Sequence, residues 1–112
     1  MNPDARDQLS NCRSSRRFPN GTAGGIEPGS ITLPLCRQLV DTWITVTENE
    51  IASAMQRLYE LHDFMVEGAA GVAVAGLLKM RTELAEAHCA VILCGGNIAP
   101  QFFISATEID SF

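Results

Sequence analysis

The sequence is short of positive charge and of long apolar runs, and each shortage argues against a class of partner. Eight lysine and arginine residues stand against 13 aspartate and glutamate residues, which gives a formal net charge of −5. This balance argues against a general affinity for nucleic acid or for an anionic membrane, because both favour basic surfaces. The longest apolar stretch is free of charge only over the eleven residues 68–78, whereas a membrane-spanning helix needs about 20. We therefore expect neither nucleic acid nor membrane as a partner.

Histidine and paired cysteine are scarce as well. His62 and His88 are too few and too far apart to suggest a zinc site, so no metal ligand set can be identified. The four cysteines contain no Cys-x-x-Cys pair and no repeated spacing; they are Cys12, Cys36, Cys89 and Cys94. Because no apolar signal segment precedes them, we expect a reducing, cytoplasmic setting rather than a disulfide scaffold.

The chain has 112 residues, enough for one small domain. Residues 1–19 show no hydrophobic period, and we expect them to form a disordered tail. The arginines at 13, 16 and 17 could meet a phosphate, although a solvated tail is the favoured interpretation. The glycine-rich segment 21–29 could also cradle a phosphate, but it matches neither a P-loop nor the dinucleotide-binding pattern.

Three helices are expected from the apolar spacing. The first spans about 32–40, with Pro34 tolerated in its first turn. Thr47 and Glu50 fit a capping box that opens the second helix, which runs to about His62. The third begins near Glu67 and is crowded with glycine and alanine, so another part of the protein must approach its backbone closely.

Two segments are typical of strands, and they set the expected fold class. Residues 42–47 are rich in β-branched and aromatic side chains, and 89–94 form a continuous apolar run like a central strand covered on both faces. About forty residues of helix separate them, which favours parallel pairing. We therefore predict an α/β fold with an incomplete three-layer parallel-sheet domain, whose neighbouring strands are missing or supplied by a partner chain.

The end of the second strand is a candidate binding site. Open α/β sheets bind ligands at the carboxyl ends of their strands, and Cys94-Gly-Gly-Asn97 follows 89–94 there. The local sequence alone favours a simple turn over a ligand site. Glu67 is either a helix cap or an acceptor beside a ligand, and the cap is favoured locally. Lys79, the only lysine, lies at the polar end of a helix, where solvation is favoured over a Schiff base.

Taken together, five segments resemble the serine/threonine dehydratase (threonine ammonia-lyase) branch of the pyridoxal-phosphate-dependent enzymes, which have the tryptophan-synthase β-like fold. In chain order they are GTAGGIEPGS (21–30), LVDT (39–42), ITVTENEI (44–51), VEGAAGV (66–72) and LCGGNI (93–98). The resemblance covers 78 of the 112 residues, from about Gly21 to Ile98.

The resemblance implies pyridoxal phosphate as cofactor and a role for each residue of the candidate site. The Cys94 side chain would meet the pyridine nitrogen, in a position where most of the family has serine. Gly95, Gly96 and Asn97 would form the turn beneath the ring. Glu67 would lie near the same edge of the cofactor, and the loop 21–25 would lie by the active-site wall.

The implied reaction converts a β-hydroxy amino acid into a 2-oxo acid and ammonia. The family's Ser-Phe-Lys motif and its phosphate loop have no counterpart here, so residues 20–112 resemble only the C-terminal part of such an enzyme. We therefore predict a truncated or frame-disrupted fragment that is inactive alone and that associates with itself or with a missing N-terminal half. The alternatives are a non-catalytic ligand-binding or subunit-interaction module and a stand-alone α/β protein that dimerises to complete its sheet.

Overall fold

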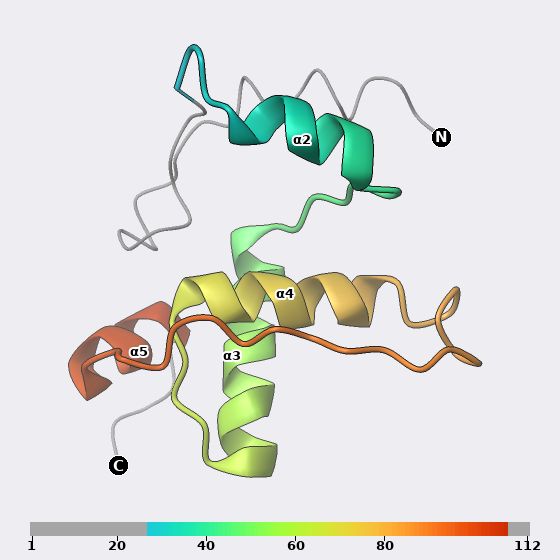
Figure 1. The fold of residues 1–112 in the computed structure, drawn as a ribbon. Helices are drawn as coiled ribbons and strands as arrows, with labels where there is room; N and C mark the ends of the chain where they lie inside the picture. The colour runs from blue at the N-terminus through green and yellow to red at the C-terminus, as the bar shows by residue number, and fades with distance from the viewer. Residues whose placement is uncertain (1–26, 108–112) are drawn as a thin grey trace. The chain divides into compact units, whose positions relative to one another are not determined.

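Four helices form within residues 27–107, the part of the chain that the computed structural model describes (Figure 1). They are α2 (Thr32–Leu39), α3 (Glu48–His62), α4 (Gly68–Lys79) and α5 (Pro100–Thr107). The chain divides into two units, Met1–Thr45 and Val46–Phe112. The predicted tail at 1–19 and the loop at 21–25 lie outside the described residues.

In the first unit, α2 confirms the helix predicted at 32–40. Pro34 lies in its first turn, where a missing N–H leaves no hydrogen bond unmade. The helix ends with the Val40 N–H donating to the carbonyl oxygen of Cys36 at 3.0 Å. Leu35 and Leu39 are exposed, and no residue of α2 is buried.

The second unit begins with α3, whose limits follow from local chemistry. Thr47 is the N-cap: its hydroxyl accepts from the Glu50 N–H at 3.2 Å, and the Glu50 carboxylate accepts from the Thr47 N–H at 2.6 Å. This confirms the predicted capping box. The helix ends at His62, and the C-cap residue Asp63 adopts the left-handed conformation with φ 56° and donates its N–H to the Tyr59 carbonyl oxygen at 2.9 Å.

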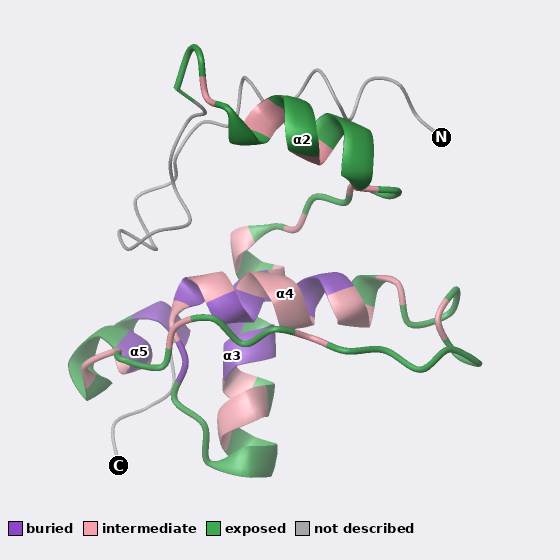
Figure 2. Cartoon of the chain, viewed as in Figure 1, coloured by how far each residue is buried: buried purple, intermediate pink, exposed green. Residues whose placement is uncertain are grey.

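The core of this unit lies where α3, α4 and α5 meet (Figure 2). Met55 of α3 and Phe103 of α5 are its largest fully buried side chains. The helices α3 and α4 approach closely at Gly71, where an added Cβ would lie 2.7 Å from Met55 Cγ and 3.0 Å from Ile51 Cγ2. A larger side chain at 71 would keep the helices apart, so the close backbone approach predicted for the third helix occurs at Gly71.

The last helix, α5, was not among the predicted elements. It packs on α3 through Phe103, whose ring centroid lies 5.4 Å from that of Tyr59. Pro100 is its first residue, a position where proline is favoured because its fixed φ suits the helix. That proline was the signal available in the sequence.

The two predicted strands are the main difference from expectation. Neither 42–47 nor 89–94 is a strand, and the described residues contain none. Within the described residues 89–94 is not covered, since Ile92 is 81% exposed and Leu93 40%; this exposure agrees with the expectation that the neighbouring strands are missing. A strand satisfies its backbone N–H and C=O groups only by pairing with a neighbour. No adjacent strand exists among residues 27–107, so the predicted parallel sheet is not confirmed.

None of the helices between residues 27 and 107 combines the length and the apolar character that crossing a membrane requires.

Candidate functional site

The structure brings Glu67 against the glycine turn that follows 89–94, although 30 residues separate them in the sequence. The Glu67 side-chain oxygen Oε1 accepts from the Asn97 N–H at 3.1 Å. The Glu67 backbone N–H donates to the Gly95 carbonyl oxygen at 3.0 Å. The start of α4 and the turn are therefore joined by two hydrogen bonds, one from the side chain and one from the backbone.

Gly95 fits this arrangement for two reasons. Its φ of 97° lies in the region that L side chains rarely adopt. An added Cβ would also lie 3.0 Å from both Cδ and Oε2 of Glu67, tighter than an ordinary contact. Gly96 differs, because a Cβ built there meets no atom within 4 Å. The turn is thus closed on the Gly95 side by Glu67 and open at Gly96.

Cys94 and Asn97 flank the two glycines, and both are exposed. The Cys94 thiol is free, and a thiol is a weak hydrogen-bond donor and acceptor that can meet a ring nitrogen. The Cys94 thiol is exposed, and open space lies beside Gly96 two residues further on; this combination suits a flat aromatic group whose polar atom faces the sulfur. The residues present therefore fit the nitrogen edge of pyridoxal phosphate.

The local prediction for Glu67 is corrected in one respect. Glu67 does hold the N-cap position of α4, but its side chain makes no capping hydrogen bond there. The carboxylate turns instead to the Asn97 N–H. The family resemblance placed Glu67 near the same edge of the cofactor as the turn, but the spacing of residues 67 and 97 did not by itself predict the hydrogen bond to the Asn97 N–H.

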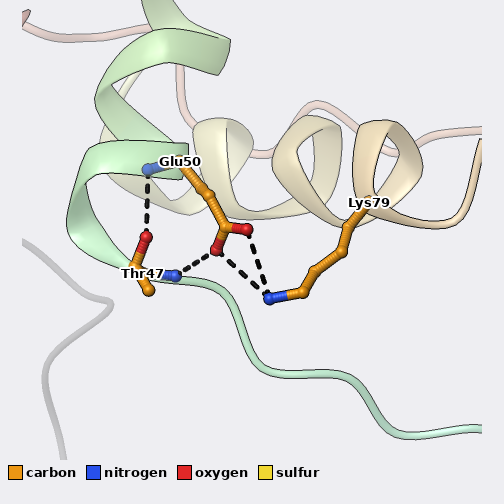
Figure 3. Close-up of polar contacts among 3 residues, drawn as sticks. All are labelled: Thr47, Glu50 and Lys79. Carbon is orange, nitrogen blue, oxygen red and sulfur yellow. Dashed lines mark hydrogen bonds and ion pairs between the residues drawn. The ribbon is translucent and has the colours of Figure 1, made fainter.

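The only lysine is engaged elsewhere. Lys79 Nζ lies 3.2 Å from Oε1 and 3.3 Å from Oε2 of Glu50, the carboxylate that also closes the capping box of α3 (Figure 3). The Thr47 backbone N–H and then the Lys79 ammonium hold the pKa of Glu50 below its ordinary value of 4.5. This ion pair explains the polar end of α4 and joins it to the start of α3.

A shallow, open depression of about 370 Å³ lies beside this ion pair. It is lined by Glu50, Ala75, Leu78, Lys79, Arg81 and Thr82. Its lining includes neither Glu67 nor any residue of the turn. The depression and the candidate cofactor residues are therefore separate features, and we place the candidate site at the turn because its residues carry the relevant chemistry.

Comparison with curated proteins gives several relatives of one kind. The chain is 42% identical over 72 residues to an L-threonine ammonia-lyase of Geobacter sulfurreducens, covering 64% of this chain and 18% of that protein. It is 41% identical over 85 residues to the serine racemase of Bos taurus, covering 71% of this chain and 25% of that protein. An L-threonine dehydratase of Escherichia coli is 36% identical over 73 residues, covering 63% of this chain and 22% of that protein.

The chain thus spans about a fifth to a quarter of the length of these relatives. No solved structure matches it significantly. The family model for the pyridoxal-phosphate-dependent enzymes matches residues 2–95, which is most of the chain and includes Glu67, Cys94 and Gly95. That family implies the tryptophan-synthase β-like fold and pyridoxal phosphate as cofactor. This match shows that the chain belongs to the pyridoxal-phosphate-dependent enzyme family, and the relatives that it resembles are a threonine ammonia-lyase, a serine racemase and a threonine dehydratase.

Proposed function

We propose that the chain carries the part of a serine/threonine dehydratase active site that holds the nitrogen edge of the cofactor. The parent reaction would eliminate the β-hydroxyl of a hydroxy amino acid and yield a 2-oxo acid and ammonia. The observation that supports this most directly is the exposed Cys94 thiol beside a turn that is open at Gly96 and closed by Glu67 at Gly95.

The residues of this chain would bind and orient. Cys94 would place its thiol at the pyridine nitrogen, and Gly96 would let the ring approach the backbone because no side chain stands there. Asn97 would end the turn, held through its N–H. When bound, pyridoxal phosphate supplies the carbanion stabilisation that the reaction requires.

The proposed function also implies that the chain is inactive by itself. The reaction needs a lysine that forms an imine with the cofactor, and Lys79 is the only lysine. Its ammonium is paired with Glu50 beside a depression that contains no residue of the turn. A lysine and a phosphate loop would therefore have to come from another chain segment.

A complementary partner would also cover the apolar surface at 89–94. Ile92 and Leu93 are exposed in a segment whose composition suits a central strand. We propose that a missing N-terminal half of the enzyme, or failing that a second copy of this chain, covers it. The amino-acid substrate would bind only in the completed site.

The test combines the chain with a separately produced N-terminal segment of a threonine ammonia-lyase that contains the Ser-Phe-Lys motif. The mixture is expected to form a 2-oxo acid from threonine or serine, whereas either part alone forms none. Replacement of Cys94 with alanine should weaken pyridoxal phosphate binding in the mixture, and replacement with serine should preserve it. Turnover by the 112-residue chain alone would contradict the proposed inactivity.

A second candidate is a non-catalytic binding module, because the turn is already held within this chain by Glu67. In that case the isolated chain would bind pyridoxal phosphate or an amino acid saturably, at micromolar concentration, without turnover in the mixture. Calorimetric titration of the isolated chain with each ligand separates the two candidates.

A further inference from the structure

We propose that Glu67 is a positioning residue that acts on a bound ligand only through the turn 95–97. Its carboxylate holds the turn by accepting the Asn97 N–H, and it does not contact the cofactor. The identity of the ligand rests on the proposed function above, whereas the positioning role rests on the contacts of Glu67 alone.

The contacts of the Glu67 carboxylate point to the turn. Oε1 accepts from the Asn97 N–H at 3.1 Å. Oε2 lies against Gly95, 3.0 Å from the position that a Cβ would occupy there. Oε1 therefore accepts a backbone N–H of the turn, and Oε2 occupies the space where a side chain at position 95 would begin.

The backbone of Glu67 is fixed at the start of α4. Its carbonyl oxygen accepts from the N–H groups of Ala70 and Gly71, each at 3.1 Å. Gly71 in turn packs against the buried Met55 of α3. Glu67 therefore links the turn to the helical core: its backbone oxygen is bonded within α4, and its carboxylate is bonded to the Asn97 N–H.

The turn needs such a restraint because packing does little to hold it. Cys94, Gly96 and Asn97 are exposed. A carboxylate is a strong acceptor for a backbone N–H, since a hydrogen bond to a charged group is roughly twice as strong as a neutral one. The Glu67 side chain makes no capping hydrogen bond to α4; its carboxylate accepts from the Asn97 N–H instead.

The test measures exchange of the Asn97 amide proton by NMR in the full 112-residue chain. Glu67→Ala removes the acceptor and is expected to speed this exchange by about tenfold or more. Glu67→Gln keeps an acceptor oxygen without the charge and is expected to speed it by only about threefold. The Gly71 amide is the internal control, because its acceptor is the backbone oxygen of residue 67, which every variant retains.

Two glycine variants form a matched pair. Gly95→Ala brings a methyl group into the Glu67 carboxylate and is expected to speed Asn97 exchange as Glu67→Ala does. Gly96→Ala meets no atom within 4 Å and should leave Asn97 protected. Unchanged Asn97 exchange in Glu67→Ala would overturn the proposal, as would equal acceleration by alanine and glutamine at 67.

A pyridoxal phosphate titration of the same variants, each mixed with the N-terminal threonine ammonia-lyase segment, separates this proposal from the proposed function. Binding should weaken about tenfold in Glu67→Ala and be largely restored in Glu67→Gln. Loss of binding in Glu67→Gln with Asn97 still protected would mean that the carboxylate contacts the ligand, and the positioning role would be wrong. If the mixture that contains the unmodified chain binds no pyridoxal phosphate, the proposed function fails, and the exchange measurement still decides the role of Glu67.

Discussion

Replacing Gly71 with alanine adds one methyl group at the closest approach of α3 and α4. The new Cβ would lie 2.7 Å from Met55 Cγ, 3.0 Å from Ile51 Cγ2 and 3.3 Å from the Ile51 backbone oxygen. Neither neighbour can yield easily, because Met55 is fully buried, Cγ lies near the root of its side chain and the third contact is backbone. The helices must therefore move apart or the core must repack.

The expected cost follows from two opposing effects. Overpacking a core commonly destabilises by about 1–3 kcal/mol, and contact with backbone places this site in the upper part of that range. Alanine gains roughly 1 kcal/mol over glycine within a helix. The net loss in the free energy of unfolding should be about 1–2 kcal/mol, or about 5–10 °C in melting temperature for a domain of this size.

Urea unfolding followed by circular dichroism at 222 nm measures this loss. Met55→Ala removes the nearest clashing atom, so Gly71→Ala in that background should cost at least about 1 kcal/mol less than in the unmodified chain. The reasoning would be refuted if Gly71→Ala raised stability by about 1 kcal/mol in both backgrounds, as helix propensity alone requires.

Three further changes test the helix ends and the core. Asp63→Gly should raise stability by roughly 0.5–1 kcal/mol in urea unfolding, because the left-handed φ of 56° costs a residue with a Cβ more than it costs glycine. A loss of stability would contradict the C-terminal geometry of α3. The lowered pKa of Glu50 stabilises the fold above pH 4.5, and this contribution disappears as the pH falls through the lower folded value. Glu50→Gln should therefore melt below the unmodified chain at pH 7, by a margin that shrinks as the pH falls below 4.5, and a pH-independent difference would exclude this cause. Phe103→Ala removes a fully buried ring that packs at a tilt against the Tyr59 ring and should cost about 3–5 kcal/mol. A loss below about 1 kcal/mol in thermal or urea unfolding would mean that α5 does not pack on α3.

Local sequence determined the helix limits and the chemistry of the candidate site. The Thr47 and Glu50 capping box starts α3 where the pattern predicts, because both hydrogen bonds form within four consecutive residues. The motif Cys94-Gly-Gly-Asn97 by itself predicts only a turn, but together with four further segments in the family's order it predicted the family and pyridoxal phosphate, and the family match confirms both. Among the four helices of residues 27–107, only α5 was not predicted, and Pro100 was its one signal in the sequence.

Contacts between distant residues were decided by the tertiary structure. The bond from the Asn97 N–H to Glu67 depends on where α4 begins relative to the turn, which no local pattern encodes. The same is true of the expected sheet: 89–94 has the composition of a buried strand, but a strand forms only when a neighbour pairs with its backbone. Residues 27–107 contain no such neighbour, so Ile92 and Leu93 remain exposed and the segment stays irregular.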